Sequence, residues 1–312
     1  MKEQETHILS SSFPSTLEEF IGQEKAIETL TIAVGASKIL GTALPHVLIY
    51  GPAGLGKTTL AACTANTIGA PIYYAVGNKI SGMKDVDDIV RFISMRINSV
   101  VFIDEVHAMP KKIEEVFFPL MQDFNYNGTE ISPFTMFGAT TNAGDVIKPM
   151  RDRFKYTIGL QHYSDEAIFE ILMKNETIEE QAARMIAGRA FGIPRIAKNY
   201  LIQCRDQAVY DSPFDLVVRE EDVIKTMERL EIDEEGIGPT QRKMLRYLYE
   251  CGCPVGLETI AMVLDVDIDN LKELSERILM YKEYIMRTRS GRKITKTGKL
   301  YMEERGAEHG RE

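Results

Sequence analysis

Gly51-Pro52-Ala53-Gly54-Leu55-Gly56-Lys57-Thr58-Thr59 fits the phosphate-binding loop pattern G-x-x-x-x-G-K-[ST]. The run His46–Tyr50 before it is typical of a buried strand, and Thr59–Ala62 after it predicts the start of a helix. Glycines let backbone N–H groups surround phosphates, and a helix N-terminus adds partial positive charge. Lys57 then reaches the β- and γ-phosphates, and the Thr58 hydroxyl binds Mg²⁺. This context disfavours a chance glycine-rich turn and predicts a nucleoside triphosphate site.

A second predicted strand, Ser99–Asp104, is followed directly by another carboxylate, Glu105. Ligands of parallel sheets lie at the carboxyl ends of the strands, which places Asp104 and Glu105 beside the phosphate-binding loop. Asp104 is then positioned to hold Mg²⁺ through water, and Glu105 to polarise an attacking water. Acidic residues at a strand end can also form a solvated turn, but the pairing with Lys57 favours catalysis. We therefore expect an enzyme that hydrolyses a nucleoside triphosphate.

The 312 residues have an ordinary globular composition and allow two or three domains. The four cysteines lack paired C-x-x-C spacing, and no histidine lies near Cys251 and Cys253, which argues against a metal site there. Reduced thiols of this kind are typical of a cytoplasmic protein. No apolar stretch approaches membrane-spanning length, so no membrane partner is expected. Residues 1–12 lack the apolar core of a signal peptide and are expected to form a disordered tail.

The net charge of −9 conceals a basic segment near the C-terminus. Between Tyr284 and Met302 there are six basic residues and no acidic ones: Arg287, Arg289, Arg292, Lys293, Lys296 and Lys299. A locally basic element on an acidic body can bind a phosphate backbone. A solvated tail is the alternative, which the surrounding pattern disfavours.

Residues 13–162 alternate apolar runs with amphipathic stretches, as in a parallel sheet covered by helices. Beyond those already named, the expected elements are strands at 71–76 and 134–141 and helices at 86–97 and 114–123. Asn127-Gly128 lies between alternating side chains and predicts a short β-hairpin.

Two further domains are expected. Residues 163–232 have apolar residues at helical spacing and predict a small all-helical domain, with helices at 179–190 and 194–210. An acidic linker, Glu231–Gly236, precedes residues 233–304. There, helices at 240–250, 257–264 and 269–281 precede a basic hairpin around Ser290-Gly291, which describes a winged helix that binds DNA or, alternatively, a protein. Residues 305–312 are expected to form a second disordered tail.

A series of segments carries a family resemblance. They are Leu17–Gln23, Gly51–Thr59, Ile103–His107, Gly138–Thr141, Arg151–Phe154, Gly192–Ala197, Pro254–Leu257 and Arg287–Arg292. In this order they resemble the RuvB family, the bacterial AAA+ motors that drive branch migration of Holliday junctions, over nearly the whole chain from Leu17 to Tyr301. The resemblance implies an AAA+ domain, a helical lid domain and a winged-helix domain in an ATP-dependent DNA translocase of recombination and repair.

The resemblance also implies roles for individual residues. Contacts with ATP are implied for Gly51, Pro52, Gly54, Leu55, Gly56, Lys57, Thr58, Thr59, Phe20, Ile21, Tyr163, Pro194 and Arg195. Tyr163 resembles the aromatic residue that packs near the adenine. Thr58 and Asp104 are implied to hold Mg²⁺, and Glu105 to activate water. Thr141 resembles the polar sensor that orients this water, and Arg195 the second sensor, which touches the γ-phosphate from the same subunit.

Arg153 resembles the arginine finger that reaches the nucleotide of a neighbouring subunit, as in the hexameric rings that the family forms. Arginines directed at a γ-phosphate are typical stabilisers of phosphoryl transfer. From the sequence alone, Arg153 can equally form a surface ion pair with Asp152. Arg287 and Arg292 resemble the wing arginines that contact DNA, and Arg289 and Lys293 belong to the same basic segment.

Three features depart from the family pattern. The family has a longer β-hairpin before the sensor strand, which grips the junction-binding partner RuvA, whereas here only the short Asn127-Gly128 hairpin occupies this place. Phe13-Pro14 replaces Arg-Pro near the nucleotide, and Gln122-Asp123 replaces Glu-Asp. These differences indicate a divergent relative, of mobile-element or phage type, that acts alone or with another partner.

Two other functions are considered. An AAA+ loader or remodeller of a clamp or replicative helicase would fit the short hairpin, but a protein client gives no reason for six clustered cations. Asp104–His107 also fits the DExH box of a two-lobed helicase. Such a helicase needs two motor lobes, and this chain has one phosphate-binding loop and is too short for both lobes. His107 is interpreted as a packing or hydrogen-bonding residue.

Overall fold

The computed structural model describes residues 13–174, 177–213 and 216–309, so the predicted tail at 1–12 and the end of the second tail lie outside the described residues. Contacts group the chain into two compact units. The first contains the described residues up to 174 together with Ile193–Arg195, and the second contains the remainder. The predicted domain boundaries at 162 and 232 stay predictions.

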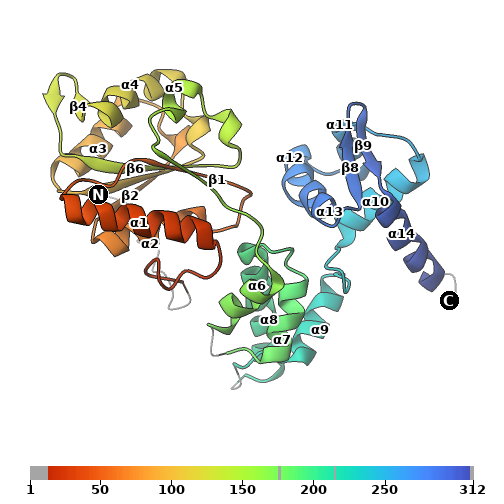
Figure 1. Ribbon diagram of the computed structural model, residues 1–312. Coiled ribbons are helices and arrows are strands. Elements are labelled where there is room, and N and C mark those ends of the chain that lie inside the picture. Colours follow the sequence, from red (N-terminus) through yellow and green to blue (C-terminus); the bar gives the residue numbers. More distant parts are fainter. Residues whose placement is uncertain (1–12, 175–176, 214–215, 310–312) are drawn as a thin grey trace. The chain divides into compact units, whose positions relative to one another are not determined.

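The first unit contains a five-stranded sheet (Figure 1). Its strands are β1 (Val47–Tyr50), β2 (Ile72–Val76), β3 (Ser99–Asp104), β6 (Phe134–Thr140) and β7 (Tyr156–Gly159), in the order β2-β3-β6-β1-β7. All neighbouring pairs are parallel. The central strands read as apolar runs without alternation because helices cover both faces. The predicted α/β fold class with a P-loop parallel sheet is confirmed.

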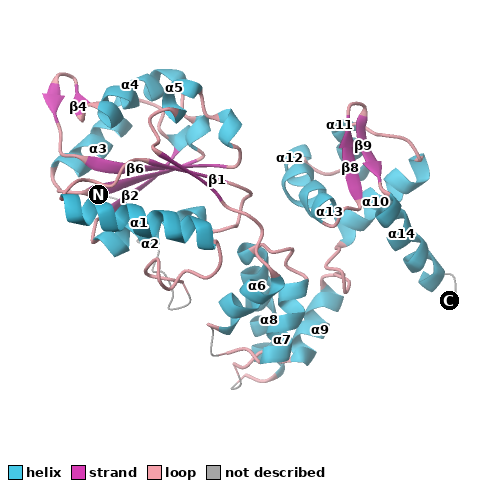
Figure 2. Cartoon of the chain, in the orientation of Figure 1, coloured by secondary structure: helices cyan, strands magenta, loops and turns pink. Residues whose placement is uncertain are grey.

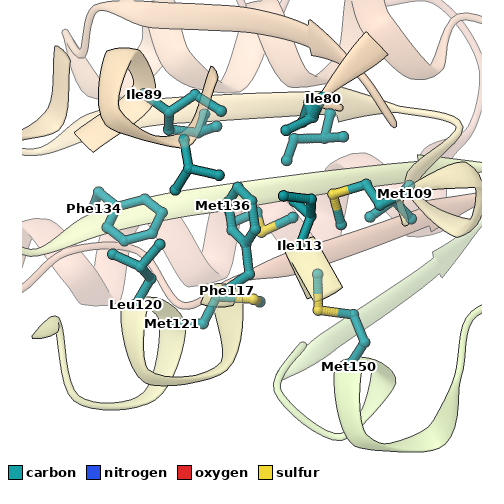
Figure 3. Packing of buried hydrophobic residues seen from close by; sticks show 14 of the residues in the cluster. Ile80, Ile89, Met109, Ile113, Phe117, Leu120, Met121, Phe134, Met136 and Met150 are labelled. Atoms are coloured by element: carbon teal, nitrogen blue, oxygen red, sulfur yellow. The ribbon is translucent and has the colours of Figure 1, made fainter. Parts of the chain in front are cut away.

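Helices lie on both faces of this sheet (Figures 1 and 2). One face is covered by α1 (Glu24–Leu40) and α2 (Lys57–Ile68), and the other by α3 (Met83–Ser94), α4 (Lys111–Gln122) and α5 (Lys148–Arg151). Short 3₁₀ turns occur at Gly77–Lys79, Val106–Ala108 and Ala143–Asp145. In the core on the α3–α5 side, Phe117 and Leu120 of α4 pack with Phe134 and Met136 of β6 (Figure 3). The helix α6 (Asp165–Met173) follows β7.

The predicted hairpin is present as two short strands, β4 (Asn125–Tyr126) and β5 (Thr129–Glu130). Asn127 and Gly128 both have positive φ, 49° and 82°, as the two-residue turns of tight hairpins require. The hydroxyl of Tyr126 donates a hydrogen bond to Asp87 Oδ1 at 2.5 Å, which ties the hairpin to α3. The hairpin is therefore held close to the body of the first unit.

A buried histidine links the end of α4 to β6. His46 Nε2 lies 2.9 Å from the carbonyl oxygen of Met121, and its Nδ1 accepts a 2.9 Å hydrogen bond from the backbone N–H of Met136. The neutral ring with its proton on Nε2 satisfies both groups. Burial, above all, lowers the pKa of His46 to about 4.

This lowered pKa predicts acid sensitivity. Between about pH 6.5 and pH 4 the unfolded chain binds a proton on His46 that the folded chain does not, so the stability falls as the pH falls. We expect the free energy of unfolding to drop by up to about 3 kcal/mol across this range because of His46 alone. Denaturant titrations of wild type and His46→Gln measure the difference. Parallel pH profiles for the two proteins would contradict the prediction.

The second unit begins with a helical region, which contains α7 (Glu180–Gly188), α8 (Pro194–Asp211, from Ile196 onward) and α9 (Glu220–Arg229). A parallel bridge between Ile178 and Val218 connects the segments that enter α7 and α9. This region agrees with the predicted all-helical part of the fold.

The winged helix follows. Its helices are α10 (Pro239–Cys251), α11 (Leu257–Leu264), α12 (Ile268–Asn270), the π-helical segment η4 (Leu271–Glu276), α13 (Arg277–Tyr281) and α14 (Lys296–His309), and its hairpin strands are β8 (Ile285–Thr288) and β9 (Gly291–Ile294). The single helix expected at 269–281 is thus three joined helical segments. The chain remains helical to His309, whereas the sequence placed a tail from 305. Among the described residues, no helix combines the length and apolarity that crossing a membrane requires.

Candidate functional site

The phosphate-binding loop connects β1 to α2, as its flanking sequence predicts. Lys57, the first residue of α2, is buried, and its ammonium group donates hydrogen bonds to the carbonyl oxygens of Gly51 at 2.8 Å and Pro52 at 3.1 Å. The charge is therefore held over the loop, at a helix N-terminus whose backbone N–H groups suit the binding of an anion. Thr58 is exposed at this end of α2. The loop has the residue set and the position that phosphate binding requires.

Two glycines of the loop allow other predicted residues to approach it. A Cβ atom at Gly54 would lie 2.9 Å from Ile193 Cγ2 and 3.0 Å from Arg195 Cβ, and φ at Gly54 is 85°. A Cβ atom at Gly56 would lie 3.4 Å from the Phe20 ring. Positive φ disfavours residues with side chains at both positions, and at Gly54 the close neighbours do so as well. The loop thus brings together residues that are far apart in the sequence.

Tyr163 closes another side of the loop. Its buried hydroxyl donates a 3.1 Å hydrogen bond to the Leu55 carbonyl oxygen, and its ring packs on Gly22. Burial raises the pKa of Tyr163, so the phenol stays a neutral donor. Ile21, next to Gly22, is half-buried. Phe20, Ile21 and Tyr163 therefore form an apolar border beside the phosphate-binding loop.

Pro194 and Arg195 begin α8 and belong to the first unit. The backbone N–H of Arg195 lies 3.4 Å from the Gly54 carbonyl oxygen. The side chain of Arg195 is exposed, and in the described ranges its guanidinium has no ion-pair or hydrogen-bond partner. Its positive charge is available to an anion held by the loop.

The two carboxylates lie at the end of β3. Asp104 is the last residue of the strand, and its Oδ1 accepts a 3.0 Å hydrogen bond from the backbone N–H of Glu105. Glu105 has a left-handed backbone conformation with φ 47°. Left-handed conformations at residues other than glycine cluster at functional sites. This backbone turn directs Glu105 away from the path of the strand.

His107 connects Glu105 to the neighbouring strand β6. Its Nδ1 lies 3.3 Å from Glu105 Oε2 and 2.9 Å from Thr140 Oγ1. The single hydroxyl proton of Thr140 goes to the Asn142 carbonyl oxygen at 3.1 Å, so we assign Nδ1–H of His107 as the donor in these contacts. The sequence predicted His107 as a hydrogen-bonding residue but did not predict Thr140. Thr141, the predicted sensor, directly follows β6 and stays a prediction.

This network predicts that His107 positions Glu105. His107→Ala is expected to lower the kcat of ATP hydrolysis about tenfold. Loss of one hydrogen bond costs about 1.4 kcal/mol, and a rise of that size in the activation free energy slows a reaction about tenfold. The KM for ATP is expected to stay within about twofold, because the described contacts of His107 go to Glu105 and Thr140 and not to the phosphate-binding loop. His107→Asn, which keeps a donor, serves as the control. Steady-state kinetics showing a raised KM with an unchanged kcat would contradict this role.

Arg153 is held by α4 and not by Asp152. Its guanidinium lies 4.3 Å from the centre of the Phe118 ring, and it donates hydrogen bonds to the Phe118 carbonyl oxygen at 3.3 Å and to Gln122 Oε1 at 3.2 Å. All these partners are neutral. Arg153 therefore keeps its full positive charge in a defined position, and the ion pair considered from the sequence is not the arrangement found.

The basic segment of the winged helix contains two kinds of cations. Arg287 and Arg292 donate from Nε to Oε1 of Glu276, at 2.7 and 2.8 Å, whereas Arg289 and Lys293 are exposed and, among the described residues, have no ion-pair partner. Glu276 was not predicted from the sequence. The alternation of strand side chains was the available signal, because Arg287 lies on the same strand face as the buried Ile285.

The chain matches two family descriptions. Residues 13–160 match the Holliday junction DNA helicase RuvB P-loop domain, and residues 234–303 match the RuvB C-terminal winged helix domain.

Proteins similar to the chain over most of its length carry the same family name. It is 38% identical to the Holliday junction branch migration complex subunit RuvB of Pseudothermotoga lettingae, across 92% of this chain and 88% of that protein. It is also 38% identical to the subunit of the same name from Chloroflexus aurantiacus, across 91% and 85%. The solved structure of the Thermotoga maritima RuvB Holliday junction branch migration motor superimposes with a TM-score of 0.84 at 36% identity, covering 94% of this chain and 98% of that one.

Proposed function

The chain belongs to the RuvB family, and on that premise we propose that it is an ATPase that drives branch migration of Holliday junctions. The observation that carries this function is the combination, in one chain, of a complete P-loop ATPase site with a basic winged helix. A P-loop site by itself serves many activities, since function resides in the site and not in the fold.

ATP is bound by the loop and its border. The phosphates are held by the backbone of Gly51, Pro52, Gly54, Leu55 and Gly56, by Lys57, and by the hydroxyls of Thr58 and Thr59. The base lies against the apolar border that contains Phe20, Ile21 and Tyr163, and Pro194 and Arg195 bind where the start of α8 approaches Gly54. The Gly54 and Gly56 contacts described above support this arrangement.

Thr58 and Asp104 suit Mg²⁺, because this ion prefers hydroxyl, carboxylate and water oxygens. When bound, Mg²⁺ neutralises developing charge on the phosphates. Glu105, oriented by His107, takes the proton from the attacking water, while Thr141 orients that water and Arg195 stabilises the charge of the γ-phosphate.

Arg153 completes the site of a neighbouring subunit, so hydrolysis requires a homo-oligomer, which we infer to be a hexameric ring. Support comes from the neutral partners of Arg153, which leave its charge uncompensated within the described part of its own chain. An arginine that is positioned but not neutralised suits a phosphate supplied by another subunit.

We propose further that the motor works without a RuvA-like partner. The hairpin at β4–β5 has two residues in each strand and is tied to α3 through Tyr126. It offers little surface for a partner to grip. A pull-down with purified bacterial RuvA is expected to show no tight binding, and stoichiometric capture would overturn this part of the proposal.

The test of the main proposal is ATP-driven dissociation of a synthetic four-way DNA junction by this protein alone. Wild type is expected to separate the junction into duplexes, and Lys57→Ala is not. ATP hydrolysis without dissociation, even after RuvA is added, would overturn the proposal and favour a loader or remodeller of another protein.

A further inference from the structure

The wing hairpin, defined as β8, β9 and the turn between them, is anchored by one buried carboxylate. Glu276, at the end of the π-helical segment η4, is fully buried. Besides the two bonds from arginine Nε atoms, its Oε2 accepts a 3.2 Å bond from Arg292 Nη2. Burial by itself would raise the pKa of Glu276, but the hydrogen bonds from Arg287 and Arg292 outweigh it and the pKa is lowered. Glu276 is therefore an ionised partner of both arginines.

The register of the hairpin explains why this partner is needed. Arg287 lies directly opposite Arg292 in the β8–β9 pair, and like charges in this position repel each other. Glu276 compensates the repulsion from the inner face. The backbone of Arg292 also exchanges two hydrogen bonds with Val255, at 2.9 and 2.7 Å, so this point of the hairpin is fixed from two sides.

The remaining cations of the hairpin point elsewhere. Lys293 is adjacent to Arg292 in β9 and is therefore on the outer face, and Arg289 lies in the turn. Both are exposed, and within the described part of the chain neither has an ion-pair partner. Arg292, by contrast, has only 20% of its side chain exposed, and Arg287 has 52%.

The helices beside the wing are acidic. From Leu257 to Glu276 there are six carboxylates and one lysine, and five of the carboxylates are exposed: Glu258, Asp265, Asp267, Asp269 and Glu273. A phosphate backbone would be repelled along this face, which contains the helix that enters a groove in many winged-helix proteins. DNA approaching this domain is therefore directed to the outer face of the wing.

We propose that Glu276 is a positioning residue of the DNA contact: it withdraws Arg292 into the hairpin anchor, holds the guanidinium of the half-exposed Arg287 by its Nε, and leaves Arg289 and Lys293 as the cations that meet the DNA backbone. Contacts of this kind position the protein without reading sequence. The inference rests on the proposed function, since it assumes that the wing binds DNA.

The test is the salt dependence of binding to a labelled four-way junction, measured with the full chain, Mg²⁺ and a non-hydrolysable ATP analogue. The slope of log K against log salt changes by about 0.9 for each phosphate contact. The double variant Arg289→Ala, Lys293→Ala is expected to flatten this slope by about 2. The matched control, Lys296→Ala with Lys299→Ala, removes the same charge from α14 and is expected to leave the slope nearly unchanged.

Two further variants test the anchor itself. Arg292→Ala is expected to lower Tm without changing the slope, because it removes a partner of Glu276 and no DNA contact. Glu276→Gln is expected to lower Tm and to steepen the slope by about 1, since Arg287 is released to bind a phosphate. A residue that only stabilised the fold would not steepen the slope.

The outcomes separate the inference from the proposed function. The inference alone would be overturned if the Arg289–Lys293 double variant and the control double variant flattened the slope of log K against log salt equally. It would also be overturned if Arg292→Ala reduced this slope by as much as the loss of one phosphate contact does. A wild-type protein without salt-dependent DNA binding would overturn both.

Discussion

Lys57→Ala abolishes ATP hydrolysis, a loss that we expect to be about 10³-fold or more. Lys57 is the buried cation of the phosphate-binding loop, and its ammonium is already held over the loop by the carbonyl oxygens of Gly51 and Pro52. The variant removes this charge from a site where the γ-phosphate gains negative charge during the reaction. Phosphate release by the purified protein is the measurement.

The control for this variant is Lys84→Ala, which removes an exposed lysine of α3 from the same unit. Its turnover is expected to match wild type. The Tm of Lys57→Ala should also be recorded, because a collapsed fold would abolish activity for another reason. Unchanged turnover in a folded Lys57→Ala protein would overturn the whole assignment of the nucleotide site.

Arg153→Ala is expected to lower kcat by about 10³-fold or more, as removal of an arginine finger does in other phosphoryl-transfer enzymes. ATP binding is expected to persist, because the Arg153 side chain packs against α4 and not at the phosphate-binding loop of its own chain. Arg151→Ala is the matched control, since Arg151 is nearby but donates a 3.4 Å hydrogen bond to the Ala143 carbonyl oxygen. Turnover and nucleotide affinity, measured together, separate a catalytic loss from a binding loss.

Mixing the two inactive proteins tests whether Arg153 acts between subunits. Arg153→Ala keeps an intact Lys57, and Lys57→Ala keeps an intact arginine finger. In an equal mixture that exchanges subunits, about a quarter of the interfaces in a ring combine an intact loop with an intact neighbouring finger. We expect turnover to recover toward that fraction. No recovery, with mixed rings shown to form, would place Arg153 in its own subunit's site or outside catalysis.

Much of the fold was predictable because its signals are local. The strand–loop–helix around Lys57 and the carboxylates after β3 are short segments whose spacing is set by backbone geometry, and both occur where predicted. The same holds for the Asn127-Gly128 hairpin, whose turn requires two residues that tolerate positive φ. The family resemblance, which the comparisons confirm, extended this to the arrangement of sheet, helical region and winged helix.

The sequence by itself thus determined the class of the protein, its phosphate-binding loop and the basic character of its wing, because each depends on residues adjacent in the chain. Only the tertiary structure decided which side chains work together. Thr140 meets His107 across neighbouring elements, Arg153 turns to α4 and not to adjacent Asp152, and Glu276 withdraws Arg292 into the wing. The physical reason is that a charged group or a hydrogen-bond donor interacts with the groups that tertiary packing places within contact distance. The positions of residues in the sequence do not determine which of them lie close together in space.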